Sequence, residues 1–161
     1  MSEVRPVQSL LFVCMGNICR SPTAEGVFRH LAAEAGLAES LLIDSAGTHA
    51  YHVGEPPDRR SQAAAERRGY ALAEIRARRV APEDFERFDL ILAMDRDNLA
   101  NLRAVSEEMH HEKIRLFLGY ASGSDDEVPD PYYGGATGFE RVLDLVEDAS
   151  RRLIDELRAR P

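Results

Sequence analysis

The sequence has no tryptophan and only two cysteines, Cys14 and Cys19. Two cysteines are too few for the disulfide framework of a small secreted domain. No apolar run approaches the ~20 residues of a membrane-spanning helix, and the polar stretch 1–6 is unlike a signal peptide. The sequence therefore favours a cytoplasmic protein that does not bind membranes.

Positive charge is also scarce. The 161 residues include 20 Lys and Arg against 28 Asp and Glu, which gives a formal net charge of −8. Nucleic-acid binding needs a basic face, so this composition argues against it. The length fits one domain spanning residues 1–161, and a 44% share of apolar residues is enough for a real core.

The most informative stretch is 14–21, Cys-Met-Gly-Asn-Ile-Cys-Arg-Ser. The apolar run at 10–13 before it is too short for a buried helix and predicts a central strand. Ser21 and Pro22 after it suit the N-cap and the first position of a helix. A loop between such elements directs several backbone N–H groups into one concavity, at the positive end of a helix dipole. It predicts a site for a tetrahedral oxyanion.

Each residue type in this loop has a chemical use. The amides, the dipole and Arg20 would stabilise the thiolate of Cys14, which makes it a nucleophile near neutral pH. Arg20 also offers a planar fork for two phosphoryl oxygens. Gly16 lets the backbone approach a ligand, Asn17 tolerates a left-handed conformation, and Ser21 can donate its hydroxyl to the thiolate. A lone cysteine is more often a buried apolar residue, but these neighbours favour a nucleophile.

Hydrophobic patterning along the rest of the chain predicts alternating strands and helices. The expected strands are 10–13, 41–43, 88–93 and 114–118, and the expected helices run from Ser21 to Gly36, over 60–68, from an Asp95 cap, and from a Thr137 capping box to about Arg158. Segments 48–58 and 119–135 are predicted to be loops, and 71–81 is irregular. This alternation implies an α/β fold whose parallel sheet has helices on both faces. Ligands of such sheets bind beyond the carboxyl ends of the strands, where Cys14 lies.

Several segments together resemble the low-molecular-weight protein tyrosine phosphatases. Residues 14–21, followed by Pro-Thr-Ala-Glu at 22–25, resemble the phosphate-binding loop of that family. Asp-Pro-Tyr-Tyr-Gly at 130–134 resembles its general-acid loop, and 45–48 and 94–99 resemble two further segments. The resemblance covers essentially the whole chain. It implies a four-stranded sheet with the phosphate-binding loop between the first strand and the first helix.

The resemblance also implies a mechanism that uses no metal and no cofactor. Cys14 attacks phosphorus, Asp130 protonates the leaving phenol oxygen and then activates water, and Arg20 with the loop amides holds the phosphoryl oxygens. The acidic residues 125–127 lie near Asp130, so spacing alone does not single out the acid. That choice rests on the resemblance.

Nine residues are expected to bind substrate: Met15, Gly16, Asn17, Ile18, Cys19, Ser21, Tyr51, Tyr132 and Tyr133. The resemblance implies that Tyr132 and Tyr133 form one wall of a slot for a phenyl ring and that Tyr51 forms the other. Without it, these tyrosines are equally well read as surface aromatics. The resemblance also implies that family members acting on phosphoarginine carry threonine at the position of Ile18. Isoleucine at this position therefore favours phosphotyrosine as the substrate.

Asn17, Ser45 and Asp95 resemble a supporting network behind the loop. Many members carry a histidine where this chain has Ile75, which puts one supporting contact in doubt. Four histidines could suggest a metal site, but no second soft ligand lies at a useful spacing from them. They are better explained as solvated surface residues. They are His49, His52, His110 and His111.

Cys19 is read either as a buried apolar thiol or, as the resemblance implies, as the partner of Cys14 in a reversible disulfide. Rival functions are a phosphoarginine phosphatase, an arsenate reductase, a non-catalytic phosphate sensor and a dithiol redox carrier. Arsenate reduction would need an external thiol, because no cysteine follows Cys19. The expected partner is a phosphotyrosine-containing protein, and a tyrosine kinase is one candidate.

Overall fold

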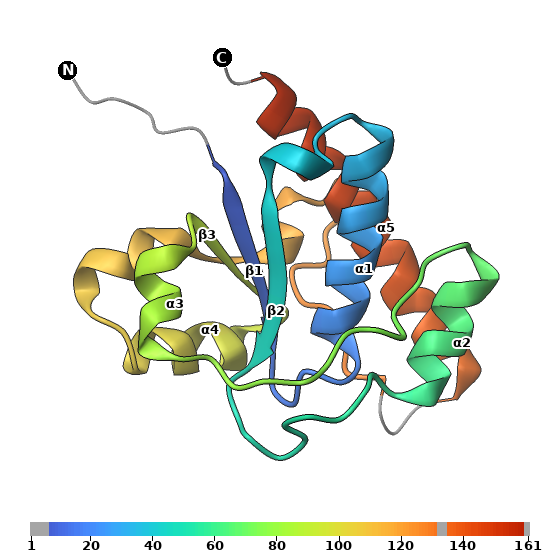
Figure 1. Ribbon diagram of the computed structural model, residues 1–161, viewed down its shortest axis with the longest axis horizontal. Helices are drawn as coiled ribbons and strands as arrows, with labels where there is room; N and C mark the ends of the chain where they lie inside the picture. The colour runs from blue at the N-terminus through green and yellow to red at the C-terminus, as the bar shows by residue number, and fades with distance from the viewer. Residues whose placement is uncertain (1–6, 132–134, 160–161) are drawn as a thin grey trace.

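Four short strands form one sheet at the centre of the molecule (Figure 1). The computed structural model describes residues 7–131 and 135–159. The strands are β1 Ser9–Cys14, β2 Leu42–Gly47, β3 Leu90–Ala93 and β4 Ile114–Leu116. Their order in the sheet is β2-β1-β3-β4, and all three neighbouring pairs are parallel. The predicted four-stranded α/β fold is confirmed.

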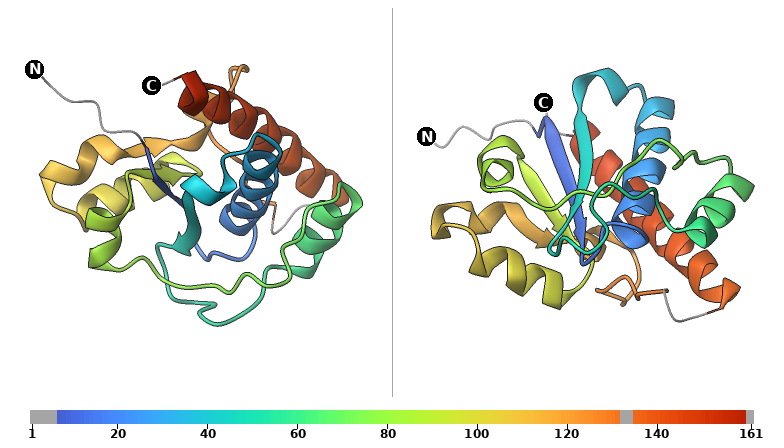
Figure 2. Two further views of the ribbon diagram at one scale, coloured as in Figure 1. Left: turned by 45° about the horizontal axis from the view of Figure 1, so that its top comes forward. Right: turned by 60° about the horizontal axis from the view of Figure 1, so that its bottom comes forward.

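Helices cover both faces of this sheet. They are α1 Arg20–Glu34, α2 Arg59–Arg67, α3 Pro82–Arg87, α4 Arg96–Ala104 and α5 Ala136–Ala159, with 3-10 turns η1 Ala38–Ser40, η2 Glu108–Lys113 and η3 Phe117–Tyr120. Helices α1 and α5 lie on one face, with α2 beside them, and α3 and α4 lie on the other (Figures 1 and 2). In the described part of the chain, none of these helices is long and apolar enough to cross a membrane.

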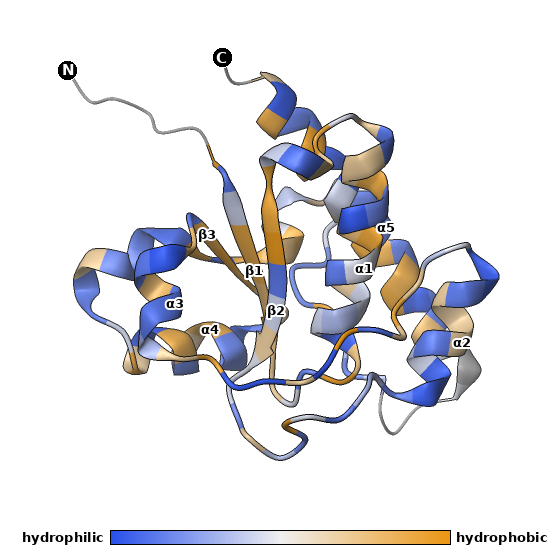
Figure 3. Cartoon of the chain, in the orientation of Figure 1, coloured by the Kyte–Doolittle hydropathy of each residue, from blue (hydrophilic) through white to orange (hydrophobic). Residues whose placement is uncertain are grey.

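The side chains of β1 alternate between two buried clusters, as expected for a strand buried on both faces. The ring of Phe12 packs on the α1 and α5 side, with its centroid 5.5 Å from that of Phe28 and 5.1 Å from that of Phe117. Leu11 and Val13 belong to the cluster on the α3 and α4 side. Burial of each such side chain stabilises the fold by about 1.5–3 kcal/mol. Figure 3 shows that the strands are mostly hydrophobic, whereas hydrophobic and hydrophilic residues alternate along the helices on either side.

Several predicted boundaries change in the structure. Strand β2 extends to Gly47 through the polar residues Asp44 and Ser45, because it pairs with β1 along its whole length. Helix α3 was not predicted. It is short, and it is stabilised by Pro82 in its first turn and by the Asp84 carboxylate, which accepts the Ala81 N–H at 2.7 Å. Strands β3 and β4 are shorter than expected.

Three helix starts test the predicted caps. Asp95 caps α4 as expected, and its carboxylate accepts the Asn98 N–H at 2.7 Å. The prediction for Ser21 is wrong: α1 begins at Arg20 with Cys19 at the N-cap, and the Ser21 hydroxyl contacts a sulfur instead. The Thr137 capping box is also not observed, because α5 already begins at Ala136.

Candidate active site

Residues 15–19 form the loop between β1 and α1, at the carboxyl edge of the sheet. The end of β2 runs directly against this loop. The Thr48 N–H donates to the Cys14 carbonyl at 2.9 Å, and the His49 N–H donates to the Met15 carbonyl at 3.0 Å. A Cβ on Gly47 would lie 2.7 Å from the Met15 carbonyl oxygen, so only glycine lets the end of β2 and the loop after β1 approach this closely.

Asn17 organises the loop from the inside. It is buried and has a φ of 58°, which confirms the left-handed conformation expected for it. Its side-chain nitrogen donates to the hydroxyls of Ser21 at 2.8 Å and Ser45 at 3.0 Å. Its side-chain oxygen accepts the Arg78 N–H at 3.0 Å. The amide is therefore held from three sides.

The sulfur of Cys14 lies where these contacts converge. It accepts the backbone N–H of Asn17 at 3.3 Å and lies 3.0 Å from the Ser21 hydroxyl oxygen. Since α1 begins at Arg20, the sulfur also faces the positive end of a helix dipole. Hydrogen-bond donors and a dipole of this sign stabilise a thiolate.

Arg20 is almost fully buried beside the sulfur. One of its terminal nitrogens donates to the Asp95 carboxylate at 2.6 Å and to the Val128 carbonyl at 3.1 Å. The other terminal nitrogen lies 3.9 Å from the Asp130 carboxylate. Burial by itself would lower the pKa of Arg20, but the nearby Cys14 sulfur and the Asp95 carboxylate outweigh burial and raise that pKa. The guanidinium is therefore a permanent cation.

A pocket of about 270 Å³ opens onto this arrangement. Eight of the sequence-predicted residues line it: Cys14, Met15, Gly16, Ile18, Cys19, Arg20, Tyr51 and Asp130. Asn17, Ser21, Ser45 and Asp95 do not line the pocket but hold the residues that do. The predicted residues Tyr132 and Tyr133 lie outside the described residues.

His52 also lines the pocket, and its sequence context alone predicted no role for it there. Its Nδ1 lies 2.7 Å from the Glu55 carboxylate, and its ring lies 3.0 Å from where a Cβ on Gly16 would be. The neighbouring rim is aromatic: Tyr51 is 71% exposed, and its ring stacks on His49 with centroids 5.2 Å apart. The only sequence signal for His52 was its position next to Tyr51.

Cys19 is a free thiol that also reaches the pocket. Burial, together with the negative charge of Asp58, raises the pKa of Cys19 to about 12. It is therefore a neutral thiol at physiological pH, unlike a cysteine poised to attack. The reversible disulfide between Cys14 and Cys19 stays a prediction.

The family resemblance noted in the sequence implies a histidine where this chain has Ile75. Its side chain is half-buried and packs against the hydrophobic core. Both N–H groups of the Asn17 side chain are used, on Ser21 and Ser45, and its oxygen accepts the Arg78 N–H, so three contacts hold this side chain with isoleucine at position 75. Among the described residues, no three His, Cys, Asp or Glu side chains are grouped to hold a metal ion.

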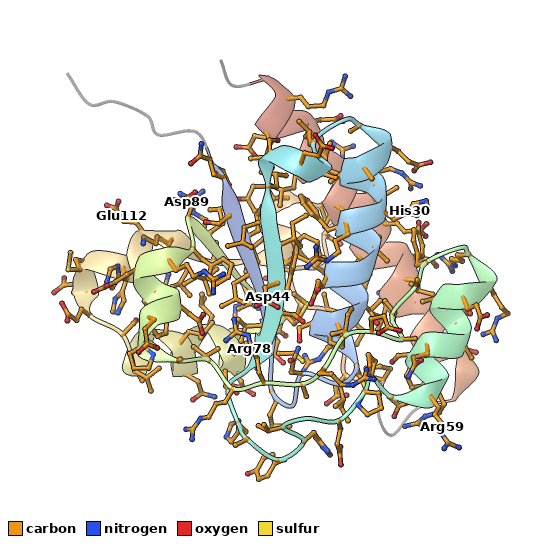
Figure 4. The ribbon with its side chains drawn as sticks, in the orientation of Figure 1. His30, Asp44, Arg59, Arg78, Asp89 and Glu112 are labelled. Carbon is orange, nitrogen blue, oxygen red and sulfur yellow. The ribbon has the colours of Figure 1, made fainter. Side chains whose placement is uncertain are left out.

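Arg78 itself is anchored by two acids. Its guanidinium donates to Asp44 on β2 at 3.1 Å and to Asp84 on α3 at 2.9 Å. Figure 4 shows Asp44 and Arg78 together near the carboxyl end of β2. These contacts hold the segment whose N–H binds Asn17.

Comparison with known proteins gives a consistent result. The family model described as "Low molecular weight phosphotyrosine protein phosphatase" matches residues 9–160. The protein of that name from Schizosaccharomyces pombe is 48% identical over 150 residues, which cover 92% of this chain and 96% of the relative. The human protein of that name is 43% identical over 151 residues, covering 92% and 95% of the two chains.

Solved structures agree. A protein tyrosine phosphatase from Entamoeba histolytica, crystallised with Hepes in the active site, superposes with a TM-score of 0.90 at 44% identity. The match covers 94% of this chain and 97% of that one. By sequence and by fold, this chain belongs to the low molecular weight phosphotyrosine protein phosphatase family.

Proposed function

We propose that the protein hydrolyses phosphotyrosine through a phosphocysteine formed on Cys14, with Arg20 as the phosphate-binding cation and Asp130 as the acid and base. The observation that carries this proposal is that all three side chains line one pocket, although Asp130 is far from the others in the sequence. Relatives named as protein-tyrosine phosphatases support the same reaction.

In the first step the Cys14 thiolate attacks phosphorus in line with the departing oxygen. A sulfur–phosphorus bond forms, the phosphorus–oxygen bond to the phenol breaks, and Asp130 transfers its proton to that oxygen. The loop amides and Arg20 bind the phosphoryl oxygens while charge spreads over them. Asp95 and the Val128 carbonyl accept from one terminal nitrogen of Arg20, and the other terminal nitrogen, 3.9 Å from Asp130, is left to bind the phosphoryl group.

In the second step water hydrolyses the phosphocysteine. The Asp130 carboxylate takes a proton from the water, a new oxygen–phosphorus bond forms, and Cys14 leaves as a thiolate. The Ser21 hydroxyl, 3.0 Å from the sulfur, stabilises that thiolate as it departs. Inorganic phosphate is released and Asp130 is again protonated.

Hydrolysis of para-nitrophenyl phosphate in the presence of EDTA tests this mechanism. We expect turnover by the wild type, none above background for Cys14→Ser, and a fall in kcat of about 10²–10⁴-fold for Asp130→Ala. Glu34→Gln, an exposed change on α1, is the control and should leave kcat unchanged. Full activity in Cys14→Ser would exclude the phosphocysteine.

For the substrate, we propose a phosphotyrosine in a cytoplasmic protein, and a tyrosine kinase is one candidate. Ile18 and the exposed ring of Tyr51 give the pocket apolar walls suited to a phenyl group. We expect phosphotyrosine peptides to be hydrolysed in preference to matched phosphoserine and phosphoarginine peptides. Capture on immobilised Cys14→Ser, which binds substrate without turnover, would identify the partner.

A further inference from the structure

Glu25 is a buried carboxylate that the proposed reaction does not use. It lies on α1 and is only 4% exposed. One of its oxygens accepts the Ser45 hydroxyl at 2.6 Å, and the other accepts two nitrogens of Arg29, at 3.0 and 3.1 Å. A buried carboxylate is costly unless donors satisfy it, so its presence behind the phosphate-binding loop calls for an explanation.

The direction of each hydrogen bond follows from the chemistry of the partners. The Arg78 N–H is only a donor, so the oxygen of the Asn17 amide must face it and the amide nitrogen must face the two serines. Glu25 when ionised is only an acceptor, so the single hydroxyl proton of Ser45 points to Glu25. Ser45 is therefore left with its lone pairs toward Asn17.

The same reasoning continues to the nucleophile. Ser21 accepts a hydrogen bond from the Asn17 amide, so its own proton is available to donate. The Cys14 sulfur at 3.0 Å is a closer acceptor than the Ala46 carbonyl at 3.4 Å. Because Asn17 also donates its backbone N–H to that sulfur, both side-chain and main-chain donors on Cys14 depend on how firmly Asn17 is held.

We propose that Glu25 is a positioning residue for the nucleophile. By accepting the Ser45 proton it keeps Ser45 available as an acceptor for Asn17, and Asn17 in turn holds its own N–H and the Ser21 hydroxyl on the Cys14 sulfur. The series of hydrogen bonds Glu25–Ser45–Asn17–Ser21–Cys14 thus connects a buried residue of α1 to the sulfur of the nucleophile. The proposal rests on the proposed function only in taking Cys14 as the nucleophile.

The hydrogen bonds to Glu25 are those that an ionised carboxylate accepts. Burial is the largest influence and raises the pKa of Glu25, and the hydrogen bond from Ser45 and the charge of Arg29 offset only part of that rise. Asp44 is the nearby acid that adds to the rise. Among the described residues, every group that hydrogen-bonds to the Glu25 carboxylate is a donor, which is the arrangement that a carboxylate needs.

The test compares two substitutions of Glu25. Methionine matches its length and helix propensity but accepts no proton from Ser45, whereas glutamine keeps one acceptor oxygen. For Glu25→Met we expect kcat for para-nitrophenyl phosphate, and the rate at which iodoacetamide alkylates Cys14 at pH 6, each to fall about fivefold, with KM within twofold. Glu25→Gln should stay within twofold of the wild type in both measurements.

A double-mutant cycle shows whether Glu25 acts through Ser45. Ser45→Ala should lower both rates about as much as Glu25→Met does, and the double variant should be no slower than Ser45→Ala within about twofold. Glu34→Gln, on the exposed side of α1, is the matched control. Alkylation needs no turnover, so it tests this chain of contacts even if the protein hydrolyses no phosphate ester.

Three results would overturn the proposal: wild-type rates in Glu25→Met, equal losses in Glu25→Met and Glu25→Gln, or losses that multiply in the double variant. The first would show that Cys14 does not depend on Glu25. The second would assign the effect to charge, and the third to a separate contribution from Glu25. If Glu25→Met does not fold, as judged by thermal unfolding, Glu25→Ala takes its place with the same expectations.

Discussion

At the scale of single residues, Gly47 leaves no room for a side chain beside the phosphate-binding loop. A Cβ at this position would lie 2.7 Å from the Met15 carbonyl oxygen and 3.2 Å from the Gly16 carbonyl carbon, and neither is a side-chain atom that can rotate away. For Gly47→Ala we expect kcat/KM to fall about tenfold or more and the free energy of unfolding to fall by about 1–3 kcal/mol. Gly119→Ala is the control, because no heavy atom outside its immediate neighbours lies within 4 Å of the new Cβ. Unchanged kcat/KM in Gly47→Ala would show that the loop can shift without loss.

Residue chemistry also sets the limit of what the sequence could predict. The left-handed conformation of Asn17 followed from its type and its place in a short loop, and the structure confirms it. His52 and the contact between Glu25 and Ser45 could not be predicted in this way. They depend on how the segment after β2 folds back over the loop, and on β2 lying beside α1. No local pattern in the sequence records either fact.

At the scale of elements, the segment that carries Asp130 is tied to the start of α4 by its own acidic residues. The Arg96 N–H donates to the Glu127 carboxylate at 2.8 Å, and the Val128 N–H donates to the Met94 carbonyl at 2.7 Å. For Glu127→Gln we expect kcat/KM for phenyl phosphate, whose leaving group needs a proton, to fall about threefold. Exposed Glu108→Gln is the control.

The leaving group makes this expectation specific. para-Nitrophenolate departs readily without a proton, so its release should be less sensitive to the position of Asp130. Because kcat/KM reports only the steps up to release of the phenol and not hydrolysis of the phosphocysteine, kcat/KM for para-nitrophenyl phosphate should change less than twofold. Equal losses with both substrates would mean that Glu127 acts on the phosphate-binding loop rather than on the acid.

Elements with strong apolar periodicity were predicted well, and those held by polar contacts were not. Strand β1 and helix α5 have continuous apolar patterns, and their predicted and observed positions agree within about two residues, as such patterns allow. The carboxyl half of β2 was missed because Asp44 and Ser45 face partners that the pattern cannot reveal, namely Arg78 and Glu25. Helix α3 was missed because six residues carry too little periodicity.

At the scale of the whole molecule, the net charge of −8 opposes the approach of a phosphorylated, acidic substrate. Binding must then come from short-range contacts with the loop amides and Arg20, since the long-range field is unfavourable. Because salt screens the long-range field but not the short-range contacts, the effect of salt on kcat/KM should differ between substrates of different charge. For an acidic phosphotyrosine peptide, raising NaCl from about 20 to about 300 mM shortens the Debye length from roughly 20 Å to roughly 6 Å and screens the repulsion.

We therefore expect kcat/KM for the acidic peptide to rise about two- to threefold over that range, mainly through KM, and kcat/KM for a matched lysine-rich peptide to fall. The physical reason is that screening removes repulsion in one case and attraction in the other, while the buried contacts of Arg20 change little. para-Nitrophenyl phosphate, with few charges, is the control and should change least. A fall in kcat/KM for the acidic peptide would show that a positive surface around the pocket, and not the net charge, governs its approach.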